Sequence, residues 1–176
     1  MALMPIIIAP DPRLKIKTTP VAAVDDEVRS LMADMLESMY AANGIGLAAP
    51  QVGDTRSVIV VDCSAKDDEP APLKMANPEI IEVSEDDLTH DEGCLSLPEH
   101  YAEVVRPDAV RVRFLDENND TREIDADGIM AICIQHEMDH LEGILFVDHI
   151  SALKRNMILR KLKKVKKQAA EEAGDG

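Results

Sequence analysis

Apolar residues recur at helical spacing in three stretches of the chain. The first follows Asp25, an expected helix cap, and comprises Val28, Leu31, Met32, Met35, Leu36 and Met39. A second helix is predicted from about Asp127 to Gly143, where glycine suits a left-handed helix end. Because its first half is apolar nearly all round, we expect this helix at the centre. A third, amphipathic and basic helix is predicted over residues 151–170.

Shorter apolar runs predict strands. Ser57–Asp62 is apolar and β-branched, which predicts a strand buried on both faces. Further strands are predicted at Glu79–Val83, Ala102–Val105 and Val110–Leu115, with a hairpin turn at Asp116–Asp120. The pattern therefore predicts an α+β fold, in which short and mostly antiparallel strands surround the central helix while the N-terminal and C-terminal helices pack outside.

Composition narrows the class of protein. The 176 residues carry no internal repeat, so we expect a single domain over residues 1–176. A net charge of -15, with only two Phe, two Tyr and no Trp, argues against sequence-specific nucleic-acid binding. No apolar run is long enough to span a membrane. Three cysteines at unrelated spacings, without a secretion signal, predict a cytoplasmic protein.

The predicted central helix contains an H-E-x-x-H motif. His136 and His140 are one helical turn apart, so both imidazoles can bind one metal ion, and Glu137 can reach a water beside it. The alternative is a chance pair of histidines in an amphipathic helix. A buried, otherwise apolar helix makes that alternative costly, which favours a metal site.

A catalytic site needs a third protein ligand. Three downstream candidates lack the H-x-x-G-x-x-H continuation or any ligand context: Glu142, Asp148 and His149. Cys133 would lie about 10 Å along the helix from His140, too far to share an ion easily. Cys133 and Cys63 are interpreted as small buried residues. Cys94 is therefore the better candidate.

Three segments together resemble the peptide deformylase family: G-I-G-L-A-A-P-Q (44–51), E-G-C-L-S-L-P (92–98) and Q-H-E-M-D-H-L-E-G (135–143). Their order and separation also fit, and the resemblance extends from Pro5 to about Lys167. It implies a metal-dependent hydrolase that removes the formyl group from the N-terminal formyl-methionine of newly synthesised proteins and releases formate.

The resemblance also implies roles for individual residues. Cys94, His136 and His140 would bind one Fe(II) per chain, with Ni(II), Co(II) or Zn(II) able to substitute. Glu137 would carry the proton from water to the leaving amine. The Gln51 side-chain amide and the Leu95 backbone N–H would stabilise the developing oxyanion.

The substrate site implied by the resemblance contains Gly44, Ile45, Gly46, Glu92, Ile129, Ile132 and Cys133. The isoleucines and Cys133 would surround the methionine side chain, although the same residues could serve as core. Glu92 is expected near the free-standing end of the substrate, and Asp139 is expected to support the site. Tyr101 departs from an arginine that is common in the family, which leaves preferences beyond the first residue open.

The resemblance also implies partners, and two competing functions stay open. The implied partners are N-formylmethionyl nascent peptides and, through the basic C-terminal helix, the ribosome near its exit tunnel; packing of that helix on the body is an equal alternative. His90, His100 and His149 are interpreted as ordinary surface or loop histidines. The competing functions are an H-E-x-x-H metalloendopeptidase and a non-catalytic, metal-stabilised binding protein.

Overall fold

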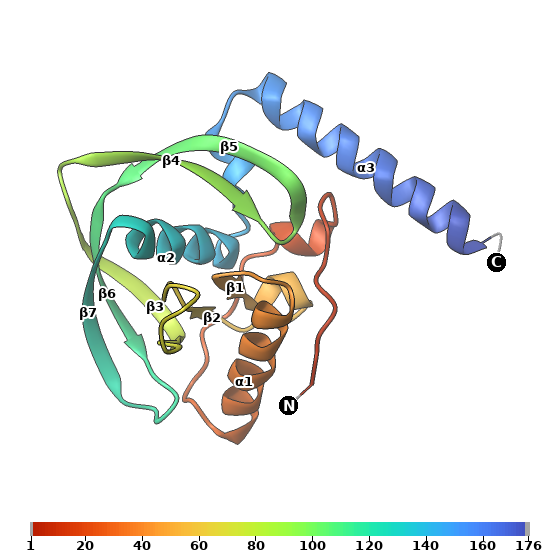
Figure 1. Cartoon of the computed structure of the whole chain (residues 1–176). Coiled ribbons are helices and arrows are strands. Elements are labelled where there is room, and N and C mark those ends of the chain that lie inside the picture. The colour runs from red at the N-terminus through yellow and green to blue at the C-terminus, as the bar shows by residue number, and fades with distance from the viewer. Residues whose placement is uncertain (1, 175–176) are drawn as a thin grey trace.

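A helix at the centre of the molecule carries the H-E-x-x-H motif, and β-structure lies on both sides of it (Figure 1). The computed structural model describes residues 2–174. The central helix, α2, spans Gly128–Leu141, and nine of its residues are buried. Above it in Figure 1 lies a long β-hairpin, and below it lie the first strands of a larger sheet. The α+β fold predicted from the sequence is confirmed.

The larger sheet has five antiparallel strands in the order β1-β2-β3-β6-β7. Their bounds are Gly46–Ala48 (β1), Val58–Val61 (β2), Leu73–Val83 (β3), Ala109–Leu115 (β6) and Thr121–Asp127 (β7). All four residues of β2 are buried, as the sequence predicts for a strand covered on both faces.

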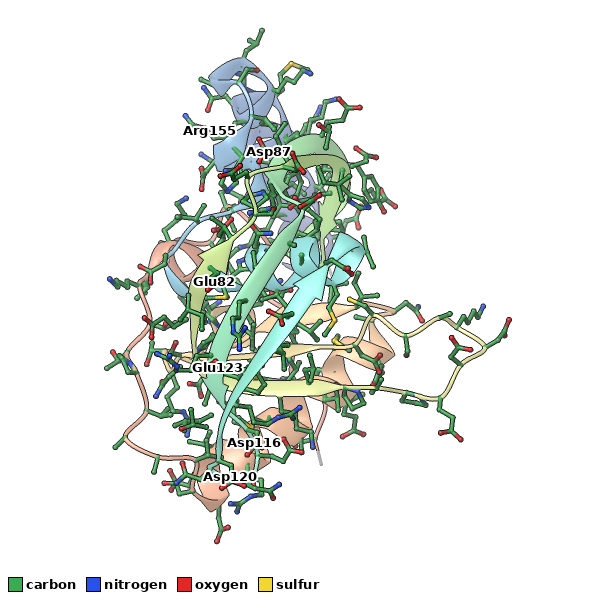
Figure 2. All side chains as sticks on the ribbon, turned by 90° about the vertical axis from the view of Figure 1, so that its left-hand side faces the viewer. Glu82, Asp87, Asp116, Asp120, Glu123 and Arg155 are labelled. Atoms are coloured by element: carbon green, nitrogen blue, oxygen red, sulfur yellow. The ribbon has the colours of Figure 1, made fainter. Side chains whose placement is uncertain are left out.

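The outer face of this sheet is charged. Arg113 on β6 pairs with Glu123 on β7 at 2.9 Å, and Arg111 contacts the same carboxylate at 3.2 Å. Glu82 on β3 stands opposite Arg111 in the strand register. Figure 2 shows Glu82 and Glu123 on this face. Over β3, β6 and β7, one face of the sheet therefore meets water through cross-strand pairs of opposite charge. The other face of the sheet packs on α2.

The hairpin consists of β4 (Asp87–Cys94) and β5 (Leu97–Pro107), which form a separate two-stranded sheet. In this hairpin, the sequence predicts only the strand Ala102–Val105. The observed β5 is therefore longer than expected, and β4 was not expected. The strands β1 and β7 were also not predicted, and β3 begins before the expected Glu79.

Two further helices pack outside. Helix α1 (Asp26–Ala41) begins at Asp25, whose side chain accepts a hydrogen bond from the Val28 N–H, as a helix cap does. Helix α3 (Ala152–Gly174) runs along one side of the molecule, and Leu162 is its only buried residue within the described range. Short 3-10 helices lie at Pro12–Lys15, Ala49–Val52 and Phe146–His149.

The extended N-terminal segment ties the three motif segments together. The Ile7 N–H donates to the Gln51 carbonyl at 2.7 Å, and the Ala9 N–H donates to the Ser96 carbonyl at 2.8 Å. Further along, the Thr18 N–H donates to the Leu141 carbonyl at the end of α2, also at 2.8 Å. These bonds hold segments that are far apart in sequence against one another.

The predicted single domain over residues 1–176 includes residues 1, 175 and 176, which lie outside the described range, and it stays a prediction. Within residues 2–174, no helix combines the length and the apolar character needed to cross a membrane.

Candidate metal centre and active site

Three candidate ligand atoms converge at one point between α2 and the hairpin. Helix α2 presents His136 and His140 on one face, with ring centroids 5.1 Å apart. Cys94, at the end of β4, completes the group, and the three ligand atoms all lie within 4.8 Å of one another. The Cys94 Sγ is 3.4 Å from the His140 Nε2. The structure thus brings together the three residues selected from the sequence.

This donor set fits a metal ion. A tetrahedral ion with bonds of about 2.0–2.3 Å separates its ligand atoms by about 3.3–3.8 Å, close to the spacing of the Cys94 and His140 donors. A thiolate with two imidazoles suits borderline-soft first-row metals rather than Mg²⁺ or Ca²⁺. Three protein ligands leave room for a fourth, which is the arrangement of catalytic rather than closed structural sites.

Behind the ligands lies a buried network of charged side chains. The His136 Nδ1 is 2.9 Å from Glu92 Oε1. Arg106 donates to both oxygens of Glu92, at 2.6 and 2.9 Å, and its third nitrogen donates to Asp139 at 2.9 Å. His149 contacts the same Asp139 oxygen at 2.8 Å. The network links the surface at His149 to the candidate ligand His136.

Glu92 is the centre of this network. Glu92 borders the cavity, but its side chain is only 3% exposed and both oxygens are engaged by Arg106 and His136. Those bonds outweigh burial and lower the pKa of Glu92 to about 2. Burial alone would lower the pKa of His136, but its bonds to Cys94 and Glu92 raise it instead. The Glu92 carboxylate therefore supports the candidate ligand His136, while its expected place near the substrate stays a prediction.

Glu137 faces the ligand cluster without a committed partner. Its Oε1 is buried, forms no hydrogen bond within residues 2–174, and lies 3.8 Å from His140 Nε2, too far for a hydrogen bond. Burial raises the pKa of Glu137 to about 7. A carboxyl group that exchanges its proton near neutral pH is suited to carry a proton during a reaction.

Gln51 is held beside Cys94. Its Oε1 accepts from the Ala48 N–H at 2.9 Å, which fixes the orientation of the amide. Its Nε2 then points to Ser96 Oγ at 3.0 Å and to Cys94 Sγ at 3.5 Å. Leu95, directly after Cys94, also lines the cavity. Two of the predicted oxyanion-binding residues therefore adjoin the candidate metal ligands.

A cavity of about 450 Å³ opens beside the cluster. Its lining includes every predicted substrate residue: Gly44, Ile45, Gly46, Glu92, Ile129, Ile132 and Cys133. Ile132 and Cys133 are buried at 2% and 6% exposure, so they form the interior of this apolar wall, while Ile45 and Ile129 are partly exposed. The strands β1 and β4 are each paired on one side only, and both contribute to the lining. An extended peptide can therefore add to a free strand edge there.

The role of Arg106 was not predicted from the sequence. Arg106 follows an apolar run at the end of a strand, and its partners Glu92 and Asp139 are 14 and 33 residues away, so no local pattern marks it as buried. His149 is exposed, as interpreted from the sequence, and it also contacts Asp139. His90 and His100 line the cavity.

Comparisons with known proteins agree with this geometry. A family model described as polypeptide deformylase matches residues 3–156, which include all three motif segments. A peptide deformylase of Methylocella silvestris is 55% identical over 175 residues, covering 98% of this chain and 89% of the relative. One from Phenylobacterium zucineum is 52% identical, covering 96% and 100%. The crystal structure of peptide deformylase from Ehrlichia chaffeensis aligns with a TM-score of 0.91 at 35% identity, covering 96% and 99%.

Proposed function

Because this chain belongs to the polypeptide deformylase family, whose members remove the N-formyl group from nascent peptides, we propose that its Cys94, His136 and His140 hold the catalytic metal ion. The observation that carries this assignment is the convergence of the three donor atoms within 4.8 Å, beside a cavity of about 450 Å³. The substrates of this metal-dependent hydrolase are N-formylmethionyl peptides.

The bound ion supplies Lewis acidity, which polarises a carbonyl oxygen and lowers the pKa of water. Glu137 takes a proton from the attacking water on its carboxylate and delivers it to the leaving amine nitrogen. The water oxygen bonds to the formyl carbon, the carbon–nitrogen bond breaks, and formate and a free N-terminus are released. The unpartnered Glu137 oxygen and the elevated pKa support this role.

Two donors stabilise the charge that develops on the formyl oxygen. They are the Gln51 Nε2, oriented by the bond from the Ala48 N–H, and the Leu95 N–H. Glu92 does not touch substrate in this proposal. It holds His136 through Nδ1, so that the other ring nitrogen faces the ion, and Arg106 neutralises its buried charge.

The methionine side chain occupies the apolar part of the cavity. Ile45, Ile129, Ile132 and Cys133 surround it, and the substrate backbone pairs along Gly44–Gly46 as an added strand. Support comes from the free edge of β1 and from Gly46, where a Cβ would lie 2.6 Å from a Glu137 oxygen. An approaching peptide therefore passes close to the proton carrier.

For the metal itself we propose Fe(II), with Ni(II), Co(II) or Zn(II) able to replace it. The thiolate and imidazole donors accept all four ions, so cellular supply rather than affinity decides occupancy. Metal analysis of protein purified anaerobically from unsupplemented cells tests this proposal, and a majority of iron is expected. The proposed location is the cytoplasm, where nascent formylated chains appear.

The decisive experiment measures formate release from formyl-Met-Ala-Ser by anaerobically prepared Fe(II) protein. We expect Glu137→Gln to lower kcat by about 10²–10⁴-fold while metal content is retained. Cys94→Ser is expected to lose both metal and activity, whereas Cys63→Ser, which alters a thiol outside the ligand set, keeps both. Full activity in Glu137→Gln would reject the assigned mechanism.

Two alternative functions predict different results in these experiments. A metalloendopeptidase would cleave internal bonds of an unformylated peptide. We do not expect this, because the Gln51 and Cys94 segments lie within the match to the polypeptide deformylase family. A non-catalytic metal-stabilised protein would release no formate when folded and metal-loaded. Treating the metal-loaded protein with a chelator distinguishes an enzyme from the non-catalytic protein, because only an enzyme loses an activity together with its metal.

A further inference from the structure

Two cysteines outside the proposed metal centre meet where α2 packs on β1 and β2. Cys63 follows the end of β2, and Cys133 lies on α2, three residues before the candidate ligand His136. Cys133 belongs to the core cluster of this interface, and Cys63 packs against that cluster. Neither cysteine is part of the candidate ligand set found within residues 2–174. The proposed reaction therefore uses neither sulfur as a reacting atom.

The carbonyl oxygen of Ile45 brings the two segments together. It accepts a hydrogen bond from the Asp62 N–H, directly before Cys63, at 2.8 Å. The Cys133 Sγ lies 3.6 Å from the same oxygen and can donate to it. The side chains of Cys63 and Cys133 also share a hydrogen bond. The fold therefore holds two thiols that are far apart in sequence in direct contact.

The two thiols differ in accessibility and in acidity. Cys63 is only partly buried, so a small oxidant can reach it, and the hydrogen bond from Cys133 lowers the pKa of its thiol. The thiolate is the form that attacks an oxidant. Cys133 is 6% exposed, and the same hydrogen bond together with burial raises its pKa. An accessible thiolate beside a protected second thiol is typical of cysteines that are oxidised to a disulfide.

We propose that Cys63 and Cys133 form a reversible disulfide when the protein meets hydrogen peroxide, and that this bond alters the wall of the substrate cavity. The Cys63 thiolate attacks one peroxide oxygen, the oxygen–oxygen bond breaks, and the departing hydroxide takes up a proton to become water. The Cys133 sulfur then attacks the sulfur of the Cys63 sulfenic acid, and the displaced hydroxyl leaves with the Cys133 proton as a second water. The two sulfurs together lose two electrons, which reduce the peroxide.

The disulfide changes the contacts of Cys133. Its S–H is consumed, so the hydrogen bond to the Ile45 carbonyl is lost. Bonded sulfurs lie about 2.0 Å apart, closer than a hydrogen-bonded pair, so the side chains must also move. Cys133 lines the cavity, and a Cβ at Gly46 would lie 2.8 Å from its Sγ and 2.6 Å from a Glu137 oxygen. We expect formate release to fall about tenfold or more, because the geometry beside Glu137 is disturbed. This effect rests on the proposed function, whereas the disulfide itself does not.

Mass spectrometry of the full-length, nickel-loaded protein tests the disulfide independently of catalysis. Nickel is chosen because ferrous iron itself reacts with peroxide. After a small molar excess of hydrogen peroxide, the intact mass is expected to fall by two hydrogen atoms. A non-reducing peptide map is expected to join the peptides that contain Cys63 and Cys133, and dithiothreitol is expected to separate them again. A bond from Cys94 to either cysteine, or oxygen addition without a disulfide, would overturn the proposal.

One variant separates the disulfide from other oxidation. Cys63→Ser is expected to keep its activity before treatment, to form no internal disulfide, and to keep formate release at the peroxide dose that inhibits the unaltered protein. Asp67→Asn, an exposed position in the loop after Cys63, is expected to be oxidised and inhibited like the unaltered protein. Equal loss of activity in Cys63→Ser would overturn the link between this disulfide and the cavity.

This inference and the proposed function can fail separately. Formate release by a protein that forms no disulfide with peroxide would overturn this inference alone. A disulfide that leaves formate release unchanged would overturn its effect on the cavity. A disulfide in a folded, metal-loaded protein that releases no formate before treatment would reject the proposed function and leave the modification site standing.

Discussion

A buried carboxylate with both oxygens engaged can hold an imidazole in one orientation, and Glu92 has this arrangement. Its Oε1 lies 2.9 Å from His136 Nδ1, which makes that nitrogen the proton donor and leaves the other for a metal. Arg106, with a side chain 5% exposed, balances the buried charge. Without that guanidinium the carboxylate would be an uncompensated charge, a costly state in an interior.

Glu92→Gln is therefore expected to weaken metal binding. The amide keeps the size of the side chain, but it loses the charge that fixes His136 and that balances Arg106. We expect affinity for the metal to fall by about 10–100-fold, as measured by competition with a coloured chelator. Asp87→Asn, an exposed position on the same strand, serves as control and is expected to bind normally. Equal affinities in the two variants would contradict the role given to Glu92.

The candidate ligands could be selected from sequence, whereas this supporting network could not. His136 and His140 follow helical spacing, and Cys94 was left as the better candidate once the other cysteines were set aside. The fold joins Arg106 to Glu92, 14 residues away, and to Asp139, 33 residues away. Local sequence patterns indicate the periodicity of apolar residues and the propensity for helix or strand. They do not indicate which charged residues, far apart in sequence, will be buried together.

At the scale of elements, the strands β4 and β7 were missed because the apolar signal in their alternation is weak. On β4 the less exposed residues are Leu88, His90 and Glu92, in the alternation of a strand, but two of the three are polar. On β7 Ile124 and Ala126 point inward between charged neighbours. The period of two was present in both, while the apolar signal that makes it recognisable was weak.

The end of β1 requires glycine for space. Gly46 does not have a positive φ, but a Cβ there would lie 2.6 Å from Glu137 Oε2 and 2.8 Å from Cys133 Sγ. Gly46→Ala is expected to displace Glu137 and lower kcat/KM by about 10²-fold. A Cβ at Gly44 would meet only the flexible end of the Leu95 side chain, at 2.6 Å. Gly44→Ala is therefore expected to cause less than a tenth of this loss in kcat/KM. Steady-state kinetics on formyl-Met-Ala-Ser measure both, and similar losses would show that space beside Glu137 is not the cause.

The two ends of α2 provide a matched pair for stability. Gly128 and Gly143 both have positive φ, at 56° and 75°, so alanine at either position costs about 1–2 kcal/mol of backbone strain. A Cβ at Gly128 meets nothing within 4 Å, but at Gly143 it would lie 2.5 Å from the Lys15 carbonyl oxygen. We expect Gly143→Ala to lower the free energy of unfolding by about 3 kcal/mol or more, and Gly128→Ala by only the strain. Urea unfolding measures both losses in the free energy of unfolding. Equal losses would mean that the N-terminal segment moves aside at little energetic cost.

At the scale of the whole molecule, charge is divided along the chain. Eight of the 19 Lys and Arg residues lie between Lys154 and Lys167, and all 34 acidic residues lie outside that segment. Figure 2 shows Arg155, on α3, at the opposite end of the molecule from Asp116 and Asp120. With Leu162 as its only buried residue in the described range, α3 leaves most of its surface to solvent. Such a dipolar molecule is oriented by a phosphate-rich surface, with the basic helix toward it and the acidic body away.

We propose that this helix docks the enzyme on the ribosome near the exit of the nascent chain, and its exposed lysines make the proposal testable. Lys163, Lys164 and Lys167 are exposed. Their triple replacement by glutamine is expected to weaken co-sedimentation with ribosomes about tenfold near 0.1 M salt and to flatten the salt dependence, because fewer phosphate counterions are released. Hydrolysis of formyl-Met-Ala-Ser is expected to stay unchanged, since these residues are outside the cavity lining.

The matched control changes net charge equally at another place. Replacing Lys66, Lys74 and Arg122 by glutamine removes three positive charges outside α3. If net charge alone governed association, both triple variants would lose ribosome binding alike. If α3 is the docking element, only its own variant does so, because a screened interaction acts over about 10 Å and depends on which charges face the partner.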